Sequence, residues 1–141
     1  MHLLDLLHDY QHLRAKAQLV SLAPAEAMRL EGLSELLRGQ PADGRRKTPR
    51  FGFPKPLPVT IAPRGGDGFV VAGLREIGAE GAALVLEVAL PEGRPLILYF
   101  DDEDRGLRFE LPAVVVWQAG GHAGVRFEGM PSRRPIGVQA A

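Results

Sequence analysis

The spacing of the hydrophobic residues changes once along this chain, at a stretch rich in proline, glycine and arginine. Before residue 41 the apolar residues recur at intervals of three and four, the period of an α-helix. After residue 56 they alternate with smaller or polar residues, which is the period of a β-strand. The chain therefore divides into a helical segment (1–40), a linker (41–56), a strand segment (57–130) and a tail (131–141) that we expect to be mobile.

The helical segment predicts two helices joined by a short connection. The first helix carries one apolar seam, made of Leu3, Leu6, Tyr10, Leu13, Ala17 and Val20. Pro24 fits the first turn of the second helix, and Gly39 provides its stop. A helical hairpin of this size buries little apolar surface, so we expect it to dock on the rest of the chain or on a second copy.

The strand segment predicts six short strands, at residues 57–61, 69–77, 82–90, 96–100, 107–117 and 124–127. Glycine, proline and acidic residues separate them. Parallel pairing needs a long crossover, usually a helix, and no segment between these strands is long enough for one. The pattern predicts a mainly β fold, either an antiparallel barrel or a sandwich.

Composition excludes several classes of protein. The 141 residues fit one domain with a short appendage, and the 17 basic and 17 acidic residues cancel. No net field therefore draws the chain to nucleic acid or to an anionic membrane. The absence of cysteine agrees with a reducing compartment, and no apolar run is long enough to span a membrane. Asp5 interrupts the region where a signal peptide would be apolar, so we expect a soluble, cytoplasmic protein.

The sequence predicts neither a catalytic centre nor a metal site. His8 and His12 lie one helical turn apart, but two ligands without a third are more typical of a solvated helix face. The four carboxylates at 101–104 lack the spacing of a calcium loop. No nucleophile elbow, zinc-protease helix or phosphate loop is present. We therefore expect a binding protein rather than an enzyme.

A basic cluster is the feature with the clearest chemical meaning. Four cationic residues fall within six positions, Arg45, Arg46, Lys47 and Arg50, and Arg46 with Arg50 forms R-x-x-x-R. Pro49 disfavours a helix before it, so the cluster lies on an extended loop. Guanidinium groups bind phosphate oxygens and the edge of guanine. A solubilising linker is one alternative; non-specific nucleic-acid binding is less favoured, because six Phe, two Tyr and one Trp offer few stacking platforms.

Three landmarks, in the right order, resemble the PilZ domain family. Arg46 and Arg50, with Arg45 as a basic neighbour, resemble its R-x-x-x-R motif. The stretch LREIGAEGAALV (74–85) resembles its Asp/Asn-x-Ser-x-x-Gly turn, and VVVWQAGGHAGVRF (114–127) resembles its closing hairpin, with Trp117 and Gly124 in place. The resemblance covers about residues 44–130, and the helical extension is similar to that of some members.

The resemblance implies a six-stranded antiparallel β-barrel, preceded by the helical hairpin, that binds cyclic di-GMP without a cofactor or metal. Cyclic di-GMP is a bacterial second messenger, and PilZ domains pass its signal to partners. The implied ligand site consists of Arg45, Arg46, Arg50, Glu76, Gly78 and Gly81. The implied relay is a linker that becomes ordered on the ligand and repositions the helices.

The second motif departs from the family pattern. Glu76 stands where the family has Asp or Asn, and Gly78 stands where it has Ser, so only Gly81 matches. We expect a weakened site, and the alternative is a degenerate PilZ domain that binds no nucleotide and acts as a protein-interaction module. The expected partners are cyclic di-GMP and either another protein or a second copy bound through the N-terminal helices. Nucleic-acid polymers and membranes are not expected partners.

Overall fold

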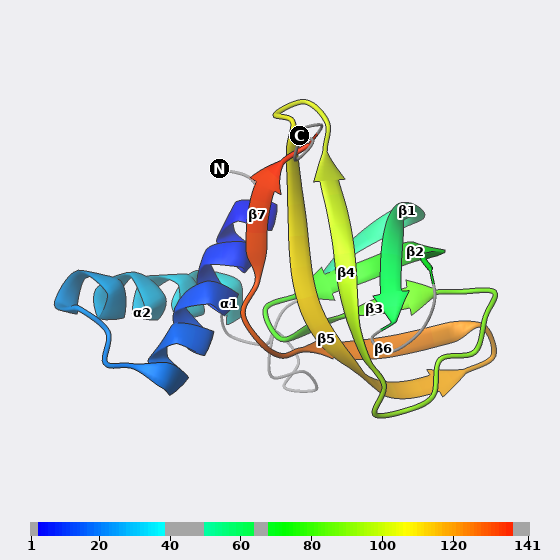
Figure 1. Cartoon of the computed structure of the whole chain (residues 1–141), viewed down its shortest axis with the longest axis horizontal. Helices are drawn as coiled ribbons and strands as arrows, with labels where there is room; N and C mark the ends of the chain where they lie inside the picture. Colours follow the sequence, from blue (N-terminus) through cyan, green and yellow to red (C-terminus); the bar gives the residue numbers. More distant parts are fainter. Residues whose placement is uncertain (1–2, 39–49, 64–67, 137–141) are drawn as a thin grey trace.

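The computed structural model describes residues 3–38, 50–63 and 68–136 as two helices followed by strands (Figure 1). The elements are α1 (Leu3–Leu19), α2 (Pro24–Arg38), β1 (Arg50–Pro63), β2 (Val70–Gly78), β3 (Gly81–Val85), β4 (Pro95–Asp102), β5 (Leu107–Ala119), β6 (His122–Phe127) and β7 (Ser132–Pro135). Within these ranges, neither helix is both long and apolar enough to cross a membrane.

Six strands close into an antiparallel barrel. Their order is β4-β1-β2-β3-β6-β5, and β5 also pairs with β4, which closes the barrel. Closure depends on β5 (Leu107–Ala119), whose first part pairs with β4 and whose second part pairs with β6. The predicted six-stranded antiparallel barrel, preceded by two helices, is therefore confirmed.

A seventh strand lies where the sequence predicted a mobile tail. Strand β7 (Ser132–Pro135) pairs with the first residues of β5, with Ser132 opposite Glu110. The Ser132 hydroxyl donates to the Glu110 carboxylate at 2.6 Å, and Arg134 forms an ion pair with the same carboxylate at 2.7 Å. The prediction of a mobile tail was therefore wrong for these residues. Strand β5 pairs with β6 only in its second part, so the edge of its first part is free to pair with β7.

Strand β1 begins earlier than expected. Residues 50–56 belong to β1 rather than to an irregular linker, because residues 50–52 pair with the end of β2 and the strand continues from there to Leu57. The prolines at 54 and 56 suggested a loop, but β4 pairs only with Thr60–Pro63 of this strand. The first part of β1 is therefore a sheet edge, where proline can be accommodated. A register shift between Gly52 and Leu57 marks a bulge in this part.

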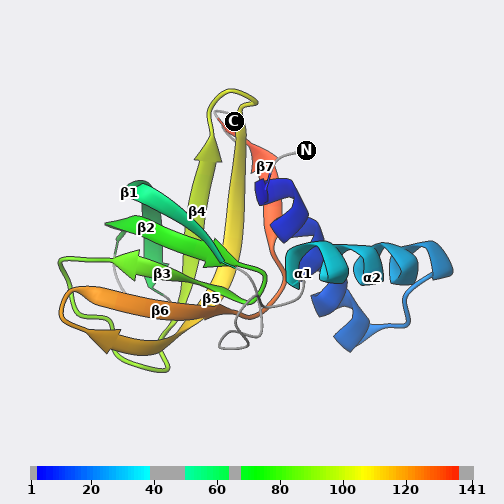
Figure 2. The ribbon, with the colours of Figure 1, turned by 180° about the vertical axis from the view of Figure 1, so that it is seen from behind.

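The helices share the hydrophobic core of the barrel. Leu7, Tyr10 and Leu13 of α1 are buried in one cluster with the inward side chains of the strands. The predicted apolar seam is confirmed at Tyr10 and Leu13, whereas Ala17 and Val20 are exposed. Leu7, which was not part of the predicted seam, is fully buried. Figures 1 and 2 show why: the first half of α1 lies against the barrel, and its second half continues past it. The hairpin thus docks on its own chain.

Helix α2 packs on α1 and extends to the side away from the barrel (Figures 1 and 2). Leu33 and Leu37 are its buried residues, while Met28 and Leu36 are 74% and 63% exposed. The position of α2 therefore depends on α1, and much of its apolar surface faces outward.

Candidate functional site

The register of β1 and β2 brings the two predicted motifs side by side. Arg50 pairs with Gly78, and Gly52 pairs with Glu76. The backbone that ends the R-x-x-x-R motif therefore runs alongside the second motif. Arg45 and Arg46 lie outside the described residues, as does the side chain of Arg50, so their contacts stay predictions.

One row of residues runs from the second motif across three further strands. Glu76 of β2 lies opposite Ala83 of β3, Ala83 lies opposite Gly124 of β6, and Gly124 lies opposite Trp117 of β5. Their neighbours Ile77, Leu84 and Val125 are buried in the core, so the alternation of side chains puts this row on the outer face. Glu76 and Trp117 are thus at the two ends of one row on the outer face, and its middle members Ala83 and Gly124 are themselves buried.

Trp117 gives this surface an aromatic platform. A Cβ at Gly124 would lie 2.0 Å from the Trp117 Nε1, so the indole rests directly on the backbone of the glycine. The indole is nevertheless 41% exposed. An exposed aromatic ring held against a strand is suited to stacking on a nucleobase. Its place in the family hairpin was recognised in the sequence, but its position in the same row as Glu76 follows only from the register.

Arg75 is a further group that sequence reasoning missed. It is exposed on β2, next to Glu76, and its guanidinium lies 3.3 Å from Nδ1 of His122 on β6. No motif singles this arginine out, because isolated surface arginines are common. Arg75 thus adds a guanidinium group beside the row, and guanidinium groups bind phosphate oxygens.

The two motif glycines have different structural roles. A Cβ at Gly81 would lie 2.0 Å from the carbonyl oxygen of Val125, so only glycine allows β3 to approach β6 this closely. Gly78 is buried and belongs to strand β2, whose extended backbone any residue can adopt. Gly81 is therefore required by packing, and its contact with a ligand stays a prediction. The backbone conformation at position 78 does not require a glycine.

Helix α1 contacts the turn that joins the two halves of the second motif. The Gln11 side-chain amide donates to the Ala79 carbonyl, and the Tyr10 hydroxyl donates to Oε1 of Glu80 at 3.0 Å. Arg14 forms an ion pair with Oε2 of Glu80. Burial lowers the pKa of Arg14, but its hydrogen bond and ion pair with Glu80 outweigh that effect and raise the pKa. No local sequence pattern indicated these contacts.

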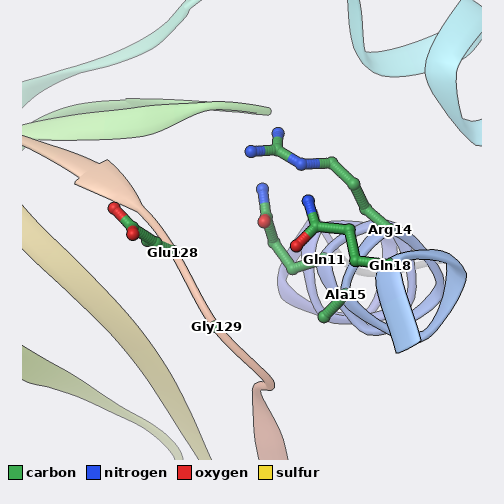
Figure 3. A pocket seen from close by; sticks show the side chains of 6 residues that line it. All are labelled: Gln11, Arg14, Ala15, Gln18, Glu128 and Gly129. Atoms are coloured by element: carbon green, nitrogen blue, oxygen red, sulfur yellow. The ribbon is translucent and has the colours of Figure 1, made fainter.

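A narrow cleft lies between α1 and the chain that follows β6 (Figure 3). The side chains of Gln11, Arg14 and Gln18 line it from the helix, with Glu128 on the other wall. Its volume of about 40 Å³ is enough for a few water molecules, since one water needs roughly 10–15 Å³ by this measure. The cleft is too small for a nucleotide, so the outer row is the better candidate for a ligand surface.

The histidine pair on α1 does not form part of a metal centre in the described ranges. The rings of His8 and His12 are stacked with their centroids 6.0 Å apart, and His8 meets the ring of Phe109 edge-on at 6.1 Å. Across residues 3–38, 50–63 and 68–136, no three histidine, aspartate or glutamate side chains come together as a metal-binding group. The ring of His8 thus packs between His12 and Phe109 of β5.

A family model and solved structures match parts of this chain. The family model for the PilZ domain matches residues 44–136, from the basic cluster to the end of β7. The crystal structure of the PilZ domain of CeSA from a cellulose-synthesizing bacterium is similar, with 19% sequence identity and a TM-score of 0.46. That similarity covers 57% of this chain and 80% of the other. No curated protein matches the chain. Because the family match spans well over half of its length, this chain belongs to the PilZ domain family, whose members are binding domains of the cyclic di-GMP receptor class.

Proposed function

We propose that this protein is a bacterial receptor for cyclic di-GMP that binds the nucleotide on the outer row and performs no catalytic step. The observation that supports it best is the register, which pairs Arg50 with Gly78 and puts Glu76 and Trp117 in one row. In this proposal the two motifs bind the phosphates and guanine edges, and Trp117 stacks on a base. Because its ligand is made inside bacteria, we place the receptor in the cytoplasm.

In this proposal the arginines supply most of the binding energy. Arg45, Arg46 and Arg50 bind phosphate oxygens and the O6 and N7 of guanine, as guanidinium groups do in general. Glu76 accepts hydrogen bonds from a guanine N–H edge, one methylene further out than the aspartate of the family. Gly78 lacks the family hydroxyl, and an ordinary hydrogen bond is worth about 1 kcal/mol. That loss corresponds to about fivefold in affinity, so the site is weakened but still functional.

The signal is proposed to pass to the helices. The linker that carries Arg45 and Arg46 joins α2 to β1, so nucleotide contacts with these arginines change the tether between helices and barrel. Ordering of a linker on its ligand is a known means of switching. The output is then a change in how the helices present their exposed surface to a partner protein.

The partner surface we propose is the groove between α1 and α2. This groove, of about 460 Å³, has Leu22 and Leu30 among its lining residues and Glu31 and Glu35 along α2. An isologous dimer through this groove would put the carboxylates of both copies into one interface, which is unfavourable. An amphipathic helix with lysine or arginine beside its apolar face fits the groove better. Sedimentation velocity should then show a monomer, and a dimer that Leu30→Asp dissociates would point to self-association instead.

Titration calorimetry with cyclic di-GMP tests the receptor proposal directly. We expect a dissociation constant in the micromolar range, and no heat with cyclic di-AMP at the same concentration, because adenine lacks the guanine O6. Absence of binding at about 100 μM, where roughly 5.5 kcal/mol of binding energy would register, would refute the receptor function. The departures from the family motif at Glu76 and Gly78 would then favour the second candidate, a PilZ domain that acts as a protein-interaction module.

A further inference from the structure

The turn between β2 and β3 is covered by helix α1. Ala79 is 0% exposed, and its carbonyl accepts a hydrogen bond from Gln11, whose side chain is itself 3% exposed. A buried hydrogen bond of this kind cannot be exchanged for water without opening the interface. Helix and turn are thus one packed unit.

Glu80 connects this turn to helix α1 and to strand β6. Its carboxylate is shared between the Tyr10 hydroxyl and the Arg14 guanidinium of α1. Its backbone carbonyl accepts from the amide of Phe127 on β6 at 2.8 Å. The side chain of Glu80 therefore belongs to the helix contact, while its backbone belongs to the barrel.

The same turn carries the second motif. Glu80 lies two residues after Gly78 and directly before Gly81, whose approach to Val125 leaves no space for a shift toward β6. A shift of the end of β2 therefore has no free space on the β6 side. The cleft of about 40 Å³ beside Gln11 and Arg14 leaves space next to this side of the helix (Figure 3).

We propose that Glu80 is a positioning residue: it joins α1 to the nucleotide-binding turn, so that nucleotide binding and the position of the helix pair are coupled. This inference rests on the proposed function and adds a second route for the signal, through the turn rather than through the linker. Coupling is reciprocal, so the helix must also affect nucleotide affinity. A turn already held by α1 costs the ligand less ordering entropy, and loss of the contact therefore weakens binding.

The test uses the full chain with Glu80→Ala, Glu80→Gln and the control Glu128→Gln. Glu128 lines the same cleft but pairs with Arg126, so its substitution leaves the α1 contact intact. Amide hydrogen exchange is measured over residues 7–14 and 78–84, with and without cyclic di-GMP, and affinity is measured by calorimetry. Glutamine keeps an oxygen that can accept from Tyr10 but loses the ion pair with Arg14.

In the wild type and in the control we expect cyclic di-GMP to change exchange in residues 7–14. In Glu80→Ala this nucleotide-dependent change should be lost, and affinity should fall about fivefold or more, the lower end of typical coupling. Glu80→Gln should be intermediate, and it carries the test alone if the alanine variant does not fold.

Four results would overturn the inference. If the wild type binds nucleotide but exchange in α1 is unchanged, or if the Glu80 variants bind as tightly as the wild type, the turn is not the route and the receptor function stands. If Glu80→Ala weakens binding while the nucleotide-dependent change in α1 persists, Glu80 supports the fold without coupling the two parts. If the wild type binds no cyclic di-GMP, the receptor function itself fails, and the coupling fails with it.

Discussion

Replacing Gly81 with alanine should damage the barrel itself. The added Cβ would lie 2.0 Å from the Val125 carbonyl oxygen and 3.2 Å from the Cα of Arg126. Real Cβ atoms essentially never come closer than 3.0 Å to such atoms, so β3 and β6 must separate by about 1 Å. The obstacle is backbone rather than a flexible side chain, and therefore the strands themselves have to move.

The cost of this separation follows from what it breaks. The hydrogen bond from the Phe127 amide to the Glu80 carbonyl, now 2.8 Å long, would be lengthened past a useful distance. Its loss costs about 0.5–1.5 kcal/mol. Crowding of a well-packed site adds about 1–3 kcal/mol. The free energy of unfolding should therefore fall by roughly 2–4 kcal/mol, which lowers the thermal midpoint by about 10 °C.

Thermal unfolding followed by circular dichroism measures the effect, with Gly32→Ala as the matched control. Gly32 is exposed in α2 and has nothing within 4 Å of an added Cβ. The same substitution there should stabilise the protein by about 0.4–1 kcal/mol, because alanine restricts the unfolded chain more than glycine does. A Gly81→Ala protein with the wild-type midpoint would show that the close approach of β3 to β6 is not required, and the assignment of a packing role to Gly81 would be wrong.

Three further outcomes are expected. Arg50→Ala should weaken cyclic di-GMP binding by roughly ten- to a hundredfold in calorimetry, since charge-assisted contacts carry about 1.5–3 kcal/mol; an unchanged affinity would remove Arg50 from the site. Glu76→Asp combined with Gly78→Ser restores the family turn and should tighten binding about fivefold, while weaker binding would mean that buried Gly78 has no room for a hydroxyl. Burial raises the pKa of Asp5, but its hydrogen bonds and ion pairs with two arginines outweigh that effect and lower the pKa below its usual 3.8. The carboxylate therefore stabilises the docked helix above about pH 4, and this contribution is lost as the pH falls further through the lowered pKa. Urea unfolding from pH 6 to pH 2 should show a smaller decline for Asp5→Asn than for the wild type, and identical declines would contradict the assignment.

The sequence by itself determined the kinds of element and the chemistry of the candidate site. The change from a helical to an alternating period is a local property, because it reflects which side chains one helix face or one strand face must bury. The identity of the motif residues Arg46, Glu76 and Gly81 is likewise read directly from the chain. These features pointed to the barrel, the two helices and the PilZ family without any knowledge of which strands pair.

Tertiary structure decided where strands begin and end and what lies beside the site. Strand β7 and the early start of β1 exist because β5 and β2 offer them pairing edges, and an edge is a property of the folded sheet. The row from Glu76 to Trp117 depends on three successive registers, in which a slip of one residue would put every side chain on the opposite face. The contact of Tyr10 with Glu80 joins residues 70 positions apart, a separation at which no local pattern exists. Hydrogen bonds between distant segments are set by how the whole chain packs, and so the link between the helices and the motif turn became visible only in the fold.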